Sequence, residues 1–264
     1  MSSSELTIHH NAGFFSCCSI RLVHIIDFFN KHKRLPVSVD SSQQFSFYKV
    51  NPYDTDSDLS QVFFENNTNF NFSFEKEIKY HHNWQFEDFN SLDPLPIRPF
   101  LKKYFTPAKY ILQIAKNFQQ EYQINFEKTI VVFYRGTDKV SETGLASYDD
   151  FLTKSKEILN KNPNFNFFLQ TDEKEFLEVF YKEFPNTFHI KKIPQGNQNE
   201  QTCVDRIVQG SDKFDLGSNF YATILLMSKC HSIITHSGNG SSWVHLYRGN
   251  SNNIYQFLNN KFLK

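Results

Sequence analysis

Hydrophobic runs and amphipathic stretches alternate along the second half of the chain. Thr129–Tyr134 is an unbroken β-branched and aromatic run, which predicts a buried strand. Further strands are expected at residues 164–170, 188–190 and 231–235, and helices at residues 107–121, 148–160, 172–184 and 218–229. Because strands and helices take turns, the sequence predicts an α/β fold with a parallel, doubly wound sheet.

The first hundred residues repeat this pattern more weakly. Strands are expected at residues 6–9 and 35–39, and Ser16 can cap a helix that runs between them to about His32. Loops are expected where Asn, Asp and Ser accumulate, at residues 43–100, and again at residues 194–215. The segment DPLPIRPF, with three prolines, resembles a linker. We therefore expect an N-terminal domain at residues 1–100 and a C-terminal domain at residues 101–264, with a cleft between them.

Polar clusters follow three of the predicted strands of the second half. They are Arg135–Lys139, Thr171–Asp172 and His236–Ser242. The carboxyl ends of parallel strands meet at one edge of a sheet, and ligands of such folds bind outside that edge. The sequence therefore predicts a ligand site built from these clusters.

Two of the clusters have the chemistry of an anion site. Arg135 carries its donors in a rigid fork that suits a phosphate, and Gly136 leaves room for the backbone to approach a ligand. The segment THSGNGSS precedes a predicted helix, where backbone N–H groups can form an anion-binding nest. It matches neither the Walker A pattern nor G-x-G-x-x-G. The alternatives are a surface loop whose charges pair with each other and a flexible turn with a serine cap.

An acidic run offers a different chemistry. Asp54, Asp56 and Asp58 alternate in the segment YDTDSD, and an Asp-x-Asp pair can hold a divalent cation. Leu59 stands where an EF-hand loop needs glycine, and no apolar strand leads into the run. This context favours a solvated acidic loop, so no metal site is predicted.

The composition of the chain excludes several classes of partner and of structure. The 264 residues include 28 basic and 28 acidic side chains, and this balance argues against a nucleic-acid-binding face. Four cysteines without C-x-x-C spacing indicate neither a disulfide framework nor a zinc site. The N-terminus lacks the pattern of a signal peptide, and no stretch approaches the roughly 18 apolar residues of a membrane span. We expect a cytoplasmic protein without a membrane span.

The motifs resemble those of a known family. VVFYRGTDKVSE is similar to the strand-and-loop motif H-x-R-R-T-D-K-V of GDP-fucose-dependent fucosyltransferases, the core α1,6 and Nod-factor enzymes, with protein O-fucosyltransferases more distant. FFLQTDEKEFLEVFYKEFPN and ILLMSKCHSIITHSG follow in the family's order, and NAGFFSCCSIRLVHIIDFF resembles its opening loop and first helix. The resemblance implies a GT-B fold of two facing Rossmann-like domains, inverting chemistry, a GDP-fucose donor, and no metal or other cofactor.

The resemblance also implies roles for individual residues. Arg135 matches the family's diphosphate-binding arginine, and Ser237 matches its phosphate-binding serine. Glu142 is the nearest substitute for the family's acidic residue proposed as the base. Phe133 stands where the motif has histidine, and Gly136 where it has a second arginine. The remaining expected donor-binding residues are Asn11, Gly13, Phe14, Thr137, Asp138, Lys139, Thr171, Asp172, His236, Gly238 and Asn239.

Two functions fit these observations. The first is an inverting, metal-independent glycosyltransferase that moves a sugar, most simply fucose from GDP-fucose, to a hydroxyl of a glycan or glycoconjugate. The second is a non-catalytic protein that keeps the fold and binds a nucleotide sugar or a glycan. The base of the nucleotide, the acceptor and the oligomeric state stay open at this point.

Overall fold

A parallel sheet occupies the C-terminal part of the chain. The computed structural model describes residues 5–51, 53–54, 56–65, 67, 77–136, 144, 146–196, 210 and 212–264. The strands of the sheet are β5 (Thr129–Tyr134), β6 (Asn166–Thr171), β7 (Thr187–Phe188), β8 (Ser232–His236), β9 (Ile254–Leu258) and β10 (Lys261–Leu263). Their spatial order is β10-β9-β8-β5-β6-β7, and only the pairing of β9 with β10 is antiparallel. The predicted doubly wound α/β sheet is thus confirmed.

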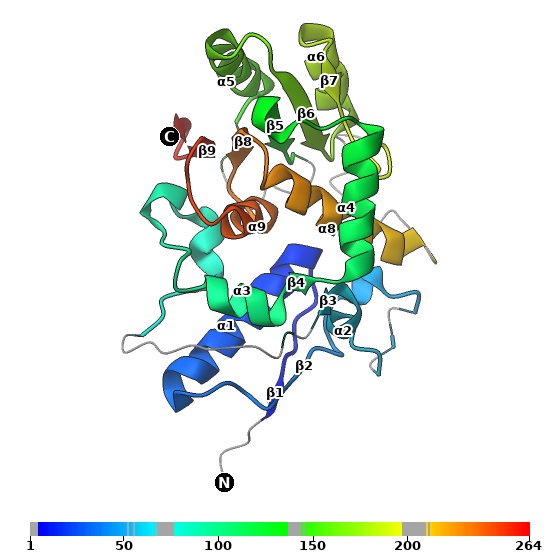
Figure 1. Cartoon of the computed structure of the whole chain (residues 1–264), viewed down its shortest axis with the longest axis vertical. Helices are drawn as coiled ribbons and strands as arrows, with labels where there is room; N and C mark the ends of the chain where they lie inside the picture. Colours follow the sequence, from blue (N-terminus) through cyan, green and yellow to red (C-terminus); the bar gives the residue numbers. More distant parts are fainter. Residues whose placement is uncertain are drawn as a thin grey trace.

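Helices cover both faces of this sheet (Figure 1). They are α4 (Lys109–Glu121), α5 (Tyr148–Lys161), α6 (Lys174–Glu183), α8 (Asp212–Met227) and α9 (Asn239–Arg248). Alternate residues of β5 pack to opposite sides: Val131 and Phe133 join the core with α4, α8 and α9, whereas Ile130 and Val132 join the core with α5 and α6. Because both faces are buried, β5 is a continuous apolar run rather than an alternating one.

The N-terminal part is built around one parallel β-α-β unit. β1 (Glu5–Thr7) pairs with β2 (Ser38–Asp40), and α1 (Phe14–His32) connects them. Short elements follow, namely η1 (Ser46–Tyr48), α2 (Ser60–Phe63), β3 (Phe64–Glu65), η2 (His82–Phe86), η3 (Phe89–Ser91), α3 (Arg98–Tyr104), β4 (Thr106–Pro107) and η4 (Phe126–Lys128). In the described residues before residue 101, the part of a Rossmann-like domain that is present is this single β-α-β unit with its two-stranded parallel sheet. The domain division near residue 100 stays a prediction.

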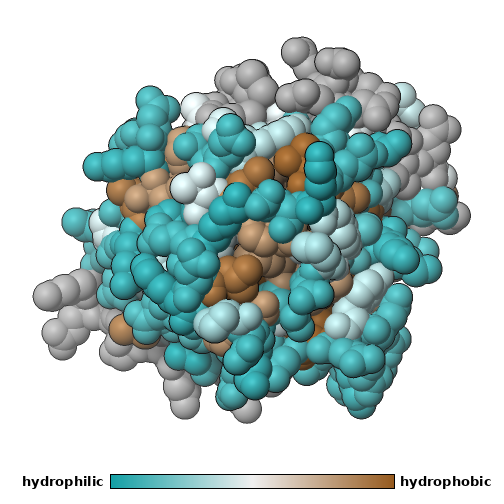
Figure 2. Space-filling view, turned by 90° about the horizontal axis from the view of Figure 1, so that it is seen from above, coloured by the Kyte–Doolittle hydropathy of each residue, from teal (hydrophilic) through white to brown (hydrophobic). Residues whose placement is uncertain are grey.

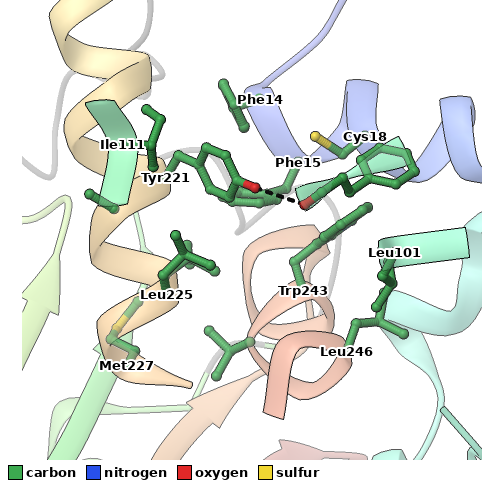
Figure 3. Close-up of a cluster of buried hydrophobic side chains, with 14 of the residues drawn as sticks. Phe14, Phe15, Cys18, Leu101, Ile111, Tyr221, Leu225, Met227, Trp243 and Leu246 are labelled. Carbon is green, nitrogen blue, oxygen red and sulfur yellow. Dashed lines mark hydrogen bonds between the residues drawn. The ribbon is translucent and has the colours of Figure 1, made fainter. Parts of the chain in front are cut away.

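Helix α1 is inserted into the core of the C-terminal part. The ring of Phe14 lies 5.5 Å from that of Tyr221 in α8, and the ring of Phe15 lies 5.6 Å from that of Trp243 in α9. Figure 3 shows these side chains gathered in one cluster together with Cys18. One buried core therefore joins residues from both sides of residue 100.

Several element predictions were wrong in their limits. The proline-rich segment is not an exposed linker, because Ile97 and Phe100 are fully buried and α3 begins at Arg98. Helix α1 begins at Phe14 with Gly13 as its N-cap, so Ser16 does not cap it. The expected loop at residues 194–215 ends early, since α8 begins at Asp212. Strands β9 and β10 were not predicted.

The surface over one end of the molecule is mainly hydrophilic. Figure 2 views the molecule from the top of Figure 1, the end where α5 and α6 lie, and hydrophobic residues show there chiefly in hollows between hydrophilic ones. None of the helices in the described part of the chain is long and apolar enough to cross a membrane.

Candidate functional site

The direction of winding reverses between β5 and β8. From β5 the chain proceeds to β6 and β7 on one side, and it later returns to add β8 and β9 on the other. Ligands of open α/β sheets bind at such a switch point, outside the carboxyl ends of the strands. Arg135 and His236 stand at these two strand ends, as the sequence predicted.

A hydrogen bond joins the two strand ends across the switch point. The backbone N–H of Arg135 donates to Nε2 of His236 at 2.8 Å. Nδ1 of His236 lies 2.9 Å from the carbonyl oxygen of Ser237 and, as the remaining ring nitrogen, donates to it. Both ring nitrogens are therefore used to hold the backbone, and the imidazole is fixed in its neutral Nδ1–H form.

Asp172 holds the residues that follow β5. Its Oδ2 accepts from Nε of Arg135 at 2.8 Å, and its Oδ1 accepts from the backbone N–H of Gly136 at 2.9 Å. Only 7% of the Asp172 side chain and 22% of the Arg135 side chain are exposed. A charge-assisted pair at this burial fixes the position of the guanidinium group. The hydroxyl of Thr171 accepts from the backbone N–H of Glu173 at 3.1 Å and closes the turn that carries Asp172.

The presence of glycine at residue 136 is explained by the position of the Glu173 side chain. A Cβ atom on Gly136 would collide with the carboxyl group of Glu173, which is itself fully buried and accepts a 2.7 Å hydrogen bond from the hydroxyl of Tyr148. Burial, and then the charges of Asp172 and Glu175, raise the pKa of Glu173. The space that a larger side chain at residue 136 would need is thus filled from within the protein. Glycine at residue 136 therefore leaves room for the carboxyl group of Glu173.

The N-terminus of α9 follows β8 directly. Gly238 is its N-cap, with a φ of 147° and a ψ of 161° that favour glycine. Ser237 is held from behind, because Nε2 of Gln256 donates to its hydroxyl oxygen at 3.2 Å. The first N–H groups of a helix lack partners within the helix and carry partial positive charge. The predicted anion-binding nest therefore has the expected helix behind it.

A second helix N-terminus faces the same place. The backbone N–H of Phe14, the first residue of α1, donates to the hydroxyl of Tyr48 at 2.7 Å. Farther along α1, Ser19 receives the indole N–H of Trp243 and donates to Oδ1 of Asn239, at 2.9 and 2.8 Å. This relay ties α1 to the first turn of α9, so the two positive helix ends are fixed relative to each other.

A cavity of about 410 Å³ lies between these elements. This is a volume typical of small-molecule sites. Its walls come from the opening loop and α1, from residues 82–86, and from the ends of β5 and β8. The predicted donor-site residues that line it are Asn11, Gly13, Phe14, Arg135, His236, Ser237, Gly238 and Asn239. Thr171, Asp172 and Gly136 are outside the lining, and of these three Asp172 holds the Arg135 side chain.

One wall of the cavity was not predicted from the sequence. His82 and Gln85 belong to η2 within the loop-rich region, and both line the cavity. The Gln85 carbonyl accepts from the backbone N–H of Gly238 at 3.0 Å, and Nδ2 of Asn239 lies 3.4 Å from Nε2 of His82. The sequence of this segment has no pattern of hydrophobic residues that predicts a strand or a helix. The adjacent histidines His81 and His82 were its only visible signal.

Aromatic side chains line another part of the cavity. They are Phe14, Phe15, Phe47, Phe86, Phe133 and Phe220. Phe133, at the position of the motif's histidine, is nearly buried and would lie 3.0 Å from a Cβ atom added to Gly240 in α9. The cavity thus combines a positively charged edge with an apolar surface suited to a planar ring.

Some predicted residues lie outside the described part of the chain. These are Thr137, Asp138, Lys139 and Glu142. In the acidic run, Oδ1 of Asp54 accepts from the backbone N–H groups of Asp56 and Ser57, as in an ordinary polar turn. Within the described ranges, no three His, Cys, Asp or Glu side chains gather as metal ligands would. Cys18 and Cys230 are buried free thiols, and Cys17 is also buried.

The fold of this chain is similar to that of solved α1,6-fucosyltransferase structures. The structure of NodZ α1,6-fucosyltransferase co-crystallised with GDP aligns over 98% of this chain and 96% of that one, with a TM-score of 0.61 and 12% identity. Two structures of fucosyltransferase NodZ from Bradyrhizobium align with TM-scores of 0.58 and 0.56, at 11% and 12% identity. They cover 100% and 92% of this chain and 98% and 92% of theirs. The resemblance predicted from the motifs is confirmed at the level of the fold.

Comparison of the sequence alone gives a different result. No protein-family model matches the chain, and no curated protein matches it. The likeness therefore resides in the arrangement of the backbone and in a few short motifs around the cavity.

Proposed function

We propose that this protein is an inverting glycosyltransferase that uses GDP-fucose or a related nucleotide sugar. The observation that carries the proposal is the cavity at the switch point, where Arg135 meets the N-termini of α1 and α9. Three sources of positive potential around one cavity suit a diphosphate. The NodZ-like fold over nearly the whole chain and the GDP in one of those structures support the same donor class.

In this proposal the diphosphate lies against Arg135 and the N-terminus of α9, and the base lies among the aromatic side chains. The acceptor hydroxyl attacks the anomeric carbon as the bond from that carbon to the phosphate oxygen breaks. Negative charge then grows on the departing diphosphate. Arg135, preorganised by Asp172, neutralises this charge without having to reorganise. We propose that Glu142 takes the proton of the acceptor hydroxyl and that no metal ion takes part.

The non-catalytic alternative rests on one observation. The position that holds a second arginine in the fucosyltransferase motif is a glycine here, and the carboxyl group of Glu173 fills its space. A chain with one arginine at this loop has less positive charge to offer the leaving group. Under this alternative the cavity binds the nucleotide sugar and releases it unchanged. An NMR time course with GDP-fucose separates the two, since transfer or hydrolysis changes the anomeric signal.

The test of donor binding is titration with GDP, UDP and dTDP against wild type and Arg135→Ala. We expect Arg135→Ala to weaken the binding of the preferred nucleotide by roughly 10- to 150-fold, because a charge-assisted contact is lost. Arg135→Lys should recover part of the affinity, since a point charge lacks the planar fork. Arg34→Ala, an exposed arginine outside the cavity lining, serves as the charge control. Equal affinity of wild type and Arg135→Ala would remove the support for this site.

A further inference from the structure

The wall that the N-terminal part contributes to the switch-point cavity differs from the wall at the strand ends. At the strand ends, Arg135 and Ser237 stand beside the N-terminus of α9, where the diphosphate lies in the proposed function. In another part of the lining, the ring of Phe220 lies 5.5 Å from that of Phe15 and 6.4 Å from that of Phe133, and this group of rings suits the base. The wall formed by the opening loop and η1 is left for the transferred sugar.

Asn11, in the opening loop, lines this wall with an amide group of fixed orientation. Its Oδ1 accepts from the backbone N–H of Ser46 at 2.9 Å. A backbone N–H can only donate, so the amide atom that faces Ser46 is the oxygen. Asn11 is exposed, and its Nδ2 makes no hydrogen bond to a described residue. The side chain therefore presents its two N–H donors to a ligand.

The other polar side chains of this wall already have partners. Oγ of Ser16 lies 2.9 Å from Nε2 of His10. The ring nitrogens of His82 lie 3.2 to 3.4 Å from the side-chain amides of Gln85 and Asn239. Asn11 is thus the polar residue of this wall whose donors remain for a ligand.

An aromatic ring accompanies the Asn11 amide. Phe47 follows Ser46 in the chain, is half-buried and lines the same cavity. A pyranose has C–H groups on its faces and hydroxyl groups at its edge, so an apolar ring next to a polar donor suits it. The wall therefore has the two kinds of surface that a sugar needs.

The segment around η1 is held against the first turn of α1. Phe45 is fully buried with its ring 5.3 Å from that of Phe14, and its φ of 60° and ψ of 24° are left-handed. A bulky residue in this region is strained, and such strain concentrates at ligand sites. The hydroxyl of Tyr48 accepts from the backbone N–H of Phe14 at 2.7 Å. These contacts fix the N–H group of Ser46 and the ring of Phe47 relative to the cavity.

We propose that Asn11 and Phe47 bind the sugar of the nucleotide-sugar donor. Nδ2 of Asn11 donates to a hydroxyl oxygen of the sugar, and the ring of Phe47 packs against its C–H face. This inference rests on the proposed function, because a nucleotide without a sugar would leave this wall empty. The diphosphate is held by the strand ends and the sugar by the N-terminal part, so the bond that breaks lies between the two walls.

The test compares each nucleotide with its sugar conjugate by titration calorimetry, GDP with GDP-fucose and UDP with UDP-glucose. We expect Asn11→Ala to raise the dissociation constant of the conjugate by about 2- to 12-fold, because one hydrogen bond is lost, and to leave that of the nucleotide unchanged. Phe47→Leu, which removes the ring but stays apolar, should act in the same direction. Asn90→Ala is the matched control and should change neither constant, since Asn90 is exposed, outside the cavity lining and bonded to Asp88.

The ratio of the two dissociation constants within one variant excludes a general effect on folding, because a partly unfolded sample weakens both ligands equally. An Asn11→Ala variant that loses affinity for nucleotide and conjugate equally, or for neither, overturns the sugar contact. Arg135→Ala reports on the proposed function separately, since it should weaken both ligands. If wild type binds no nucleotide, or Arg135→Ala binds as wild type does, the proposed function fails and this inference fails with it.

Discussion

At the scale of single residues, the loop after β5 is shaped by side chains that do not touch the cavity. Asp172 directs Arg135, and Glu173 occupies the space next to Gly136. The departure from the fucosyltransferase motif at Gly136 is therefore coupled to the buried carboxyl group of Glu173, the N-cap residue of α6. The effect on stability of a substitution at residue 136 should therefore depend on which side chain is present at residue 173.

This coupling can be measured. We expect Gly136→Ala to lower the free energy of unfolding by about 1–3 kcal/mol, because the new methyl group collides with the buried Glu173 carboxyl group. In a Glu173→Ala background the same substitution should cost much less. Urea unfolding of the two single variants and the double variant gives the interaction energy. Strictly additive effects would contradict the contact.

The lowered pKa of His245 predicts a loss of fold stability at acidic pH. Burial and the positive charge of Arg248 lower the pKa of His245 to about 4, and its ring stacks on Phe89 with a 5.3 Å separation. A depressed pKa means that this residue stabilises the fold fully above the unfolded value of about 6.5. That stabilisation, up to about 3 kcal/mol, is lost as the pH falls from about 6.5 towards 4.

The matching measurement is the slope of unfolding free energy against pH for wild type and His245→Gln. Between these pH values the slope for the variant should be shallower, because the uptake of up to one proton on unfolding is lost with His245. A variant with the wild-type slope would show that other groups dominate acid unfolding.

At the scale of elements, the cavity depends on the N-termini of α1 and α9. Gly238 sets the direction of the first N–H groups of α9, and its backbone conformation favours glycine. Gly249 closes the other end of the same helix, with a φ of 75° and nothing near an added Cβ atom. The two glycines are therefore a matched pair on one helix.

We expect both Gly238→Ala and Gly249→Ala to lower the melting temperature, because each introduces backbone strain of about 1–3 kcal/mol. Only Gly238→Ala should also weaken nucleotide binding, since it turns the helix N-terminus away from the ligand. Titration with GDP on both variants checks this. Equal loss of affinity in the two would mean that α9 contributes through general stability alone.

At the scale of the whole molecule, one buried core connects the two parts of the chain. Tyr221 of α8 donates to the carbonyl of Phe105 at 3.1 Å and packs against Phe14 of α1, and Trp243 of α9 packs against Phe15 of α1 (Figure 3). Separating α1 from α8 and α9 would expose this cluster to water. The cavity at the switch point has walls from both parts, so its shape depends on this packing.

We therefore expect thermal unfolding in one calorimetric transition, with calorimetric and van't Hoff enthalpies that agree. Saturation with the preferred nucleotide at about 100 times its dissociation constant should raise the stability by about 2.7 kcal/mol and shift the transition as a unit. Two resolved transitions, or an isolated fragment 101–264 that folds and binds nucleotide, would contradict this expectation.

The sequence by itself determined the parallel α/β character of the sheet and the strand ends at which polar residues gather. Thr129–Tyr134 was predicted with its observed limits, since a strand buried on both faces is a continuous apolar run. The polar residues after β5 and β8 were assigned to one edge because the alternation of strands and helices dictates it. These features are local or follow from topology.

The tertiary structure alone decided which side chains meet. Asp172 reaches Gly136 from the turn after β6, Gln85 reaches Gly238 from η2, and Ser19 reaches Asn239 from α1. The start of α1 at Phe14 also depends on its surroundings, because Tyr48 receives the N–H group there. Periodicity and composition carry no information about such distant partners. Arg135, Asp172 and His236 could be predicted from the sequence as site residues, whereas the contacts by which Asp172 and His236 position Arg135 could be identified only in the folded chain.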